Sequence, residues 1–228
     1  MFLRERSTQA ESFDSHERPL AEISASYCQL ARANHLFLFS HPFVIHLPRL
    51  LGRENCRSLT LLDVGAGDGL LGRRLEAWAQ QRGLRWEVTN LDVNPHALAL
   101  NPGGRNVLGS ALALPFPDAH FDAVIASQMT HHLTGAEVVT HFREAWRVAR
   151  CAVLVSDVHR NPFLLALVWL GVRVLGLNRE MREDSVISVR RGFRLDEWRR
   201  HAETAGIPGA RVWLYACTRI MLEARKAS

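Results

Sequence analysis

The 228-residue sequence predicts a doubly wound α/β fold, in which a mainly parallel sheet is covered by helices on both faces. Three observations carry this prediction. Apolar runs alternate with amphipathic segments along most of the chain. The run "LTLLDV" (59–64) is continuous, as in a strand buried on both faces. The glycine-rich stretch "GAGDG" (65–69) follows at once, where such a strand turns into a helix.

The expected elements follow one another in strand–helix order. The segment "LLGRRLEAWAQQR" has apolar residues at helical spacing and ends before Gly83. Asn94 and Pro95 open a later helix as cap and first helical residue. After the first strand we therefore expect a helix at 70–82, a strand at 85–93, a helix at 94–101, strands at 105–111 and 121–127, a helix at 135–150 and a strand at 151–157.

The ends of the chain follow a different pattern. A helix at 196–206 precedes two strand-like pieces within 210–225, which predicts a hairpin closing one sheet edge. The polar first residues, up to Pro19, predict a disordered or loosely docked tail and no secretory signal. Residues 20–51 predict lid helices. We therefore divide the chain into a tail with lid helices (1–52) and a ligand-binding domain (53–228).

An apolar stretch at 161–178, interrupted by Arg173, is shorter than the roughly 20 residues that a membrane span needs. We expect no transmembrane span there, but a buried lid helix or dimer helix. A wall for an apolar substrate and a contact with a membrane surface are the alternatives. A monomer and a homodimer both stay open.

Charge and cysteine content exclude some classes. The pI of about 9.6 rests on arginines interleaved with glutamates, a pattern of solvated helix faces, so a nucleic-acid partner is not favoured. The four cysteines include no C-x-x-C pair. This predicts a reduced, cytoplasmic protein with neither a disulfide framework nor a zinc site, and we expect no metal.

The glycine-rich stretch predicts a nucleotide cofactor, because bare backbone permits close approach of a ligand at the carboxyl edge of a parallel sheet. The pattern is D-x-G-x-G-x-G from Asp63, which matches neither a dinucleotide fingerprint nor a phosphate loop. An acid before the glycines repels a pyrophosphate but suits an ammonium group. Asp92, at the end of the second strand, suits ribose hydroxyls. S-adenosylmethionine combines these groups. The alternatives are a tight turn without ligand and, for Asp92, a helix cap.

The motifs "LLDVGAGDG", "LDVNP", "GSALALPFPDAHFDAVIAS" and "THHL", in this order, resemble those of class I S-adenosylmethionine-dependent methyltransferases acting on small molecules. The resemblance covers residues 59–157 and implies a Rossmann-like seven-stranded sheet with an antiparallel last strand. It implies that the glycines line the methionine side and that Asp92 holds the ribose. Ser110 stands where the family often has an acid for the adenine. The expected cofactor contacts are Asp63, Gly65, Ala66, Gly67, Gly69, Asp92, Val93, Ser110, Ala111, Leu112 and Ser127.

Three histidines are candidates for a catalytic base. His131 and His132 follow the fourth strand, at the edge facing the cofactor, where an imidazole can deprotonate a hydroxyl. The alternative is that the pair caps the helix beginning near Thr134. His159 follows the fifth strand at the same edge, and we expect Asp157 to orient it or to cap the next helix.

The segments outside the motifs suggest the acceptor. "DVHRNP", an apolar helix and then "SVRRGF" resemble small methyltransferases of bacterial aromatic polyketide pathways. Apolar lids, rim histidines and the Arg190–Arg191 pair predict O-methylation of a phenolic hydroxyl, although the arginines also suit an ordinary surface. A quinone-type or lipid-like ring methylated on carbon is the alternative. RNA or protein methylation and a non-catalytic cofactor-binding subunit remain as further alternatives.

Overall fold

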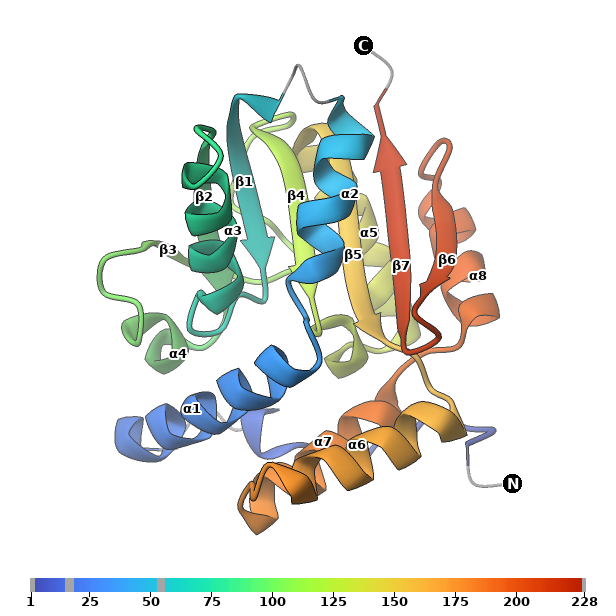
Figure 1. Cartoon of the computed structure of the whole chain (residues 1–228). Helices are drawn as coiled ribbons and strands as arrows, with labels where there is room; N and C mark the ends of the chain where they lie inside the picture. Colours follow the sequence, from blue (N-terminus) through green and yellow to red (C-terminus); the bar gives the residue numbers. More distant parts are fainter. Residues whose placement is uncertain (1–2, 15–18, 53–55, 227–228) are drawn as a thin grey trace.

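The structure is a computed structural model that describes residues 3–14, 19–52 and 56–226 (Figure 1). Its centre is a seven-stranded sheet in the order β3-β2-β1-β4-β5-β7-β6. The first five strands are parallel, whereas β7 runs antiparallel to both β5 and β6. The strands are β1 (Ser58–Val64), β2 (Arg85–Asp92), β3 (Arg105–Leu108), β4 (Phe121–Ser127), β5 (Ala149–Val158), β6 (Arg211–Tyr215) and β7 (Arg219–Arg225).

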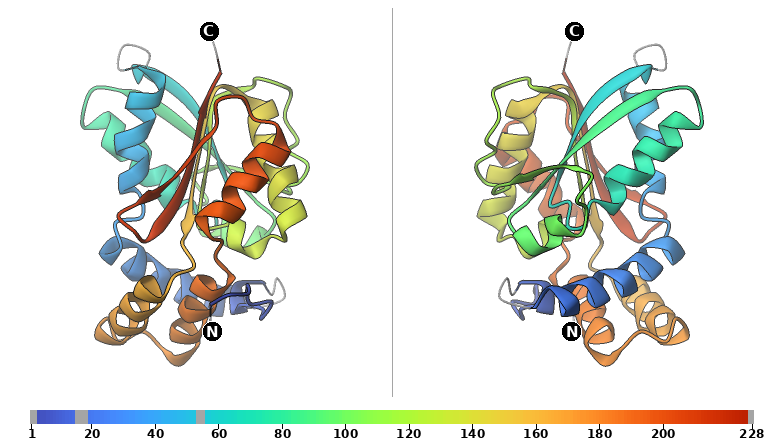
Figure 2. Two further views of the ribbon diagram at one scale, coloured as in Figure 1. Left: turned by 90° about the vertical axis from the view of Figure 1, so that its right-hand side faces the viewer. Right: turned by 90° about the vertical axis from the view of Figure 1, so that its left-hand side faces the viewer.

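Helices cover both faces of this sheet, which confirms the predicted fold class and the terminal hairpin. Two hydrophobic cores form against the sheet, and a third forms among helices beyond it. Of the two against the sheet, one includes residues of α2 and α3, and the other includes residues of α5 and α8 (Figures 1 and 2). The helices are α1 (Leu20–Leu36), α2 (His41–Leu51), α3 (Leu70–Gln80), α4 (Pro95–Ala99), α5 (Gly135–Val148), α6 (Pro162–Val174), α7 (Arg179–Arg191) and α8 (Leu195–Ala205).

Three helices form a separate layer. In Figures 1 and 2, α1, α6 and α7 lie beyond the carboxyl ends of the parallel strands, together with the N-terminal segment. This layer contains the predicted lid helix. The segment 20–51 divides in two at Phe37–Ser40, where Leu38 has a φ of 49° and ends the helical path. The predicted boundary at residues 52 and 53 adjoins residues 53–55, which lie outside the described residues.

The prediction of a disordered or loosely docked tail is wrong for residues 3–14. The Arg6 guanidinium donates hydrogen bonds to the backbone oxygens of Arg191 (2.7 Å), His131 (2.9 Å) and Leu133 (2.9 Å). Glu11 is only 6% exposed. Polar contacts dock this segment, so its sequence lacks the apolar pattern that would have indicated order. Residues 1–2 and 15–18 lie outside the described residues.

Helix α6 is apolar on two sides. Leu164, Val168 and Val172 are buried, whereas Trp169 and Val174 are more than half exposed. Contact of the outer side with a membrane surface or a second copy stays a prediction. In the described part of the chain, no helix has the length and apolar character needed to cross a bilayer.

Candidate active site

A cavity of about 370 Å³ lies where β1, β2 and β4 end, covered by α1, α7 and the N-terminal segment. It brings together most of the residues predicted from the sequence. Of these, Gly69 and His159 are not among the lining residues. The predicted residues that line it are Asp63, Gly65, Ala66, Gly67, Asp92, Val93, Ser110, Ala111, Leu112, Ser127, His131 and His132.

The loop after β1 lines the cavity with glycines, which have no side chain to occupy the space. Gly65 and Gly67 have φ of +70° and +56°, which side chains rarely adopt. A Cβ atom on Gly65 would lie 2.2 Å from Cγ of Met129, and one on Gly67 would lie 2.8 Å from Cε1 of Tyr27. Both glycines therefore have a steric requirement in addition to their conformational one.

Gly69 does not line the cavity but begins the next helix. It is the left-handed N-cap of α3, and a Cβ there would lie 2.5 Å from Nδ2 of Asn101. The third glycine of the motif thus serves the start of the helix and the packing behind the loop.

Asp92 joins the two cofactor-facing loops. Its Oδ2 accepts a hydrogen bond from the Gly67 backbone N–H (2.7 Å), and its Oδ1 accepts one from the Asn94 N–H (2.8 Å). The cap of α4 is Asn94, whose side chain accepts from His96 N–H and Ala97 N–H. The alternative reading of Asp92 as the helix cap is therefore wrong. Its carboxylate lines the cavity, where ribose hydroxyls could bind.

Asp63 has an unusual environment for a carboxylate. It is 1% exposed and lines the cavity, yet neither oxygen has a hydrogen-bond partner. Burial raises the pKa of this carboxyl well above its usual value, and the charges of Asp92 and Asp68 raise it further. An unpaired buried carboxylate is costly unless a ligand completes it. The ammonium group of S-adenosylmethionine fits this requirement, so Asp63 would hold it.

His131 lies in the 3₁₀-helix η3 (Thr130–His132) directly after β4. Its Nδ1 lies 2.7 Å from Oδ1 of Asp157, and its backbone N–H donates to Oδ2 (2.8 Å). Thr130 Oγ1 donates to the same carboxylate. Asp157, expected beside His159, therefore orients His131 instead. The pair does not cap α5, because Thr134 and Glu137 form a capping box there.

These contacts set the protonation of the buried pair. Burial opposes the charged imidazolium, but Asp157 and then Glu11 outweigh it and raise the pKa of His131. Burial likewise opposes the charged carboxylate, yet His131 and Thr130 lower the pKa of Asp157 to about 2. The carboxylate thus stays ionised and favours a proton on the imidazole Nδ1.

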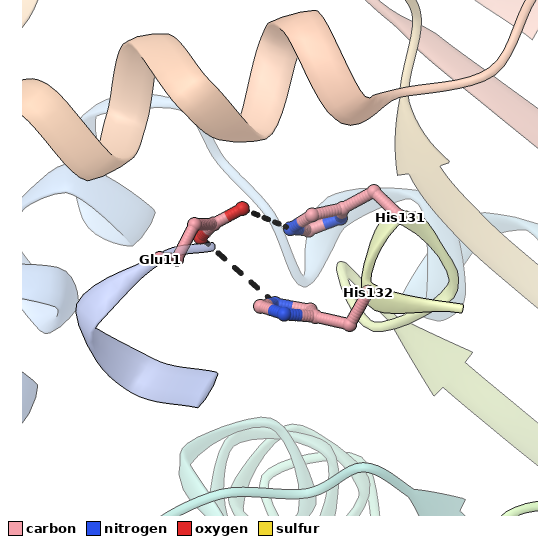
Figure 3. Close-up of side chains that lie close together, drawn as sticks. All are labelled: Glu11, His131 and His132. Atoms are coloured by element: carbon pink, nitrogen blue, oxygen red, sulfur yellow. Dashed lines mark ion pairs between the residues drawn. The ribbon is translucent and has the colours of Figure 1, made fainter. Parts of the chain in front are cut away.

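The N-terminal segment supplies two site residues that the sequence did not indicate. Asp14 Oδ1 lies 2.6 Å from Nδ1 of His132. Glu11 faces both imidazoles, with its oxygens 3.6 Å from His131 Nε2 and 3.9 Å from His132 Nε2 (Figure 3). No motif marks either acid, and both lie more than 100 positions before the histidines.

The remaining predicted contacts are absent from the cavity. His159 is half-buried, and its Nδ1 lies 2.8 Å from Nδ2 of Asn161. Neither Arg190 nor Arg191 lines the cavity. The Arg191 guanidinium donates to the backbone oxygens of His131 and His132, both at 3.2 Å, and pairs with Asp14 at 2.5 Å. Its role is to hold η3, and its charge is not presented to a substrate.

The charged side chains that line the described cavity are carboxylates, with no lysine or arginine among them. Asp63, Asp68 and Asp92 lie at the glycine loop, where a cationic cofactor suits them. The others lie at the histidine end, which we call the acceptor end of the cavity: Glu11, Asp14 and Asp184.

Because Asp63 has no hydrogen-bond partner among the described residues, its substitution should weaken cofactor binding without lowering the stability of the ligand-free protein. Asp63→Asn should weaken binding of S-adenosylhomocysteine, measured by calorimetry, at least about tenfold, because a charge-assisted contact of about 1.5–3 kcal/mol is lost. Stability of the ligand-free protein should not fall. Since the folded-state pKa is raised above the unfolded value, ionisation of Asp63 destabilises the fold as pH rises above about 4.

Asp122→Asn is the matched control. This carboxylate accepts from the Thr60 N–H (2.8 Å) and hydroxyl (2.9 Å) and pairs with Arg150. Its loss should lower the free energy of unfolding in urea and leave cofactor affinity unchanged. Equal affinity in wild type and Asp63→Asn would contradict the assignment of Asp63.

Gly67→Val should abolish cofactor binding, because its Cβ would meet the Tyr27 ring at 2.8 Å and its methyl groups would enter the cavity. Gly83→Val is the control, since Gly83 also has a positive φ, of +70°, but a Cβ there would have no atom within 4 Å. Both variants carry the backbone strain, of about 1–2 kcal/mol. Calorimetry should show binding only for the control, and binding by both would refute the steric argument.

Comparison with known proteins agrees with this geometry. Residues 62–152 match the family model described as a methyltransferase domain. A demethylmenaquinone methyltransferase from Roseiflexus sp. (strain RS-1) is 35% identical over 137 residues, which are 52% of this chain and 55% of that protein. The chain thus spans about half the length of the curated relatives it matches.

Two solved structures share the fold over most of the chain. The plantazolicin methyltransferase BamL, in complex with a triazolic desmethylPZN analog and SAH, has a TM-score of 0.69 at 11% identity and covers 91% of both chains. An S-adenosylmethionine-dependent methyltransferase from Aquifex aeolicus has a TM-score of 0.58 at 17% identity, covering 92% of this chain and 100% of that one. The matched methyltransferase domain, the sheet order and the glycine loop therefore agree, and over most of its length the chain has the fold of these S-adenosylmethionine-dependent methyltransferases.

Proposed function

We propose that this protein transfers a methyl group from S-adenosylmethionine to the hydroxyl of a small aromatic metabolite, a phenol of the polyketide type. The observation that carries the proposal is the buried Asp157–His131 pair, which lines the same cavity as the glycine loop, with His132 beside it. One cavity could therefore hold both the methyl donor and the acceptor.

For methyl transfer the protein must position the acceptor and favour ionisation of its hydroxyl group. The sulfonium of the cofactor is already a strong methyl donor, so holding the acceptor oxygen in line with the methyl carbon and sulfur contributes most of the acceleration. A phenol has a pKa of about 10, by analogy with tyrosine, and is a poor nucleophile while protonated. The protein must therefore favour loss of the hydroxyl proton at neutral pH.

The histidine pair is placed for this task. Asp157 binds Nδ1 of His131 and Asp14 binds Nδ1 of His132, so both rings are held with Nε2 directed toward Glu11 (Figure 3). In the simplest form of the reaction, Nε2 of His131 accepts the hydroxyl proton. Asp157 acts through His131 as a positioning residue.

The cavity also fits the flat body of an aromatic acceptor. Apolar side chains from the N-terminal segment, α1, α7 and the residues on either side of η3 line it. These are Phe13, Tyr27, Leu30, Met129, Leu133 and Met181.

Methylation of a quinone-type ring on carbon is the second candidate. The relatives named demethylmenaquinone methyltransferase favour it, since they match about half of this chain at 34–35% identity. Both candidates share a flat acceptor with a ring hydroxyl whose ionisation activates either the oxygen or the ring carbon. The site geometry therefore suits both.

Loss of the histidines should impair turnover far more than cofactor binding. His131→Ala and His132→Ala should lower the rate of methyl transfer to a phenol, with the larger loss of about 10²–10⁴-fold for the residue that promotes ionisation. The deficit should shrink above the pKa of the phenol, where the acceptor ionises without help. His120→Ala, an exposed ring stacked on Phe116, is the control. Wild-type rates in both site variants would move the base role to His159 or to no residue.

The position of the new methyl group separates the candidates. With isotopically labelled cofactor and panels of phenols, hydroquinones and RNA, we expect a labelled aryl methyl ether, identified by the methyl carbon shift in NMR. A methyl group on ring carbon would establish the quinone-type reaction. Label in RNA alone, or no transfer at all, would refute the small-molecule proposal.

A further inference from the structure

The acceptor end of the cavity lacks the positive charge that a phenolate needs. Glu11, Asp14 and Asp184 line it, and Arg191 is turned toward backbone oxygens. These carboxylates would repel an ionised hydroxyl. A cation placed among them would remove this conflict.

Three side chains already surround a position for such a cation. Glu11, His131 and His132 each offer one ligand atom, and these atoms lie within 4.8 Å of one another. The Glu11 oxygens lie 3.6 Å and 3.9 Å from the two Nε2 atoms, too far for hydrogen bonds (Figure 3). Within the described residues, no other group of histidine, cysteine and carboxylate ligands meets this criterion.

We propose that Glu11, His131 and His132 bind a divalent transition-metal ion at the acceptor end of the cavity. Zinc bonds to imidazole nitrogen and carboxylate oxygen are about 2.0–2.2 Å long, which places neighbouring ligands of a tetrahedral ion about 3.4 Å apart. The two distances to Glu11 exceed this by 0.2–0.5 Å, and all three ligand atoms lie within 4.8 Å of one another. Metal binding therefore requires the three side chains to draw closer together.

Each of the three proposed ligands is held by a further side chain, as is common in metal sites. Each histidine has a carboxylate on its Nδ1, Asp157 for His131 and Asp14 for His132, so each Nε2 has its lone pair free for an ion. Ser188 Oγ donates to Oε2 of Glu11 at 2.8 Å and fixes the third ligand. All three ligands are thus oriented in advance.

Among the described residues, the position between Glu11 and the two histidines lacks both a hydrogen-bond donor and positive charge. Glu11 is 6% exposed, and its Oε1 has no hydrogen-bond partner. Glu11, Asp14 and Asp157 contact the two imidazoles, and Arg191 pairs with Asp14 at 2.5 Å and lies 3.7 Å from Glu11. Three carboxylates thus surround the two imidazoles, an arrangement that favours a bound cation.

The ligand set also limits the kind of ion. Two imidazole nitrogens and one carboxylate suit Zn²⁺, Fe²⁺ or Co²⁺, whereas Mg²⁺ and Ca²⁺ prefer oxygen ligands only. Three protein ligands leave positions open toward the cavity, as in catalytic rather than structural metal sites.

The consequence for the reaction rests on the proposed function. The ion engages both Nε2 lone pairs and takes over from the free imidazole the task of favouring the ionised hydroxyl. The hydroxyl proton passes to solvent, the oxygen forms its bond to the methyl carbon, and the electron pair of the C–S bond stays on sulfur. The products are an aryl methyl ether, S-adenosylhomocysteine and one proton.

Metal binding can be tested without any acceptor. The full chain, freed of metal with a chelator, is titrated with Co²⁺ and followed by visible absorption, and Zn²⁺ is then used as competitor. We expect one Co²⁺ per chain, no thiolate charge-transfer band from the cysteines, and displacement by one Zn²⁺. Glu11→Gln and His132→Ala should each weaken Co²⁺ binding more than about tenfold, and Asp157→Asn should weaken it about 10–100-fold.

His120→Ala should bind Co²⁺ like the wild type. Circular dichroism and S-adenosylhomocysteine affinity show whether each variant is folded, and the partly exposed His132 provides a variant that tolerates truncation if Glu11→Gln does not fold. Absence of binding at 100 µM Co²⁺, or equal binding in wild type and both ligand variants, would overturn the site. Full phenol methylation by the chelated protein would overturn its part in the reaction. Intact binding without methylation of any phenol would instead refute the proposed function.

Discussion

The carboxylate of Asp157 is the constraint on which the site depends. Placed at the end of strand β5, it accepts hydrogen bonds from the Thr130 hydroxyl, the His131 backbone and imidazole, and the Val158 N–H. Four donors in a buried place keep it ionised and fix η3 against the sheet. His131 therefore takes its position from a strand, whereas the ring of His132 is held by Asp14 of the N-terminal segment.

The helical layer beyond the sheet supplies the part of the cavity lining that the strands and their loops do not. The segment 3–14, α1 and α7 each place side chains in the cavity, and the buried Arg191 ties α7 to η3 and to Asp14. The helices of this layer share an apolar core of their own, and the segment 3–14 is joined to them and to η3 by polar contacts as well. The cofactor part of the site thus rests on the sheet, and the acceptor part depends on how the layer is docked.

This division explains what the sequence could reveal. The glycine loop, Asp63, Asp92 and the histidine pair were predictable because each follows a strand whose apolar pattern is local and strong. The order of the strands and the terminal hairpin were predictable for the same reason. Glu11 and Asp14 were not, because they belong to a polar segment whose docking depends on contacts more than 100 residues away. The partner of Asp157 was misassigned for a related reason: proximity along the chain favoured His159, but the parallel pairing of β4 with β5 places His131 beside it.

The acidic lining of the cavity has a consequence for turnover. S-adenosylmethionine enters with a positively charged sulfur, and the sulfur of S-adenosylhomocysteine is neutral. A cavity lined by carboxylates without lysine or arginine attracts the first more than the second. The step that makes the product therefore also removes part of the attraction that retained the donor. The carboxylates that attract S-adenosylmethionine therefore also favour replacement of S-adenosylhomocysteine by a new molecule of the donor.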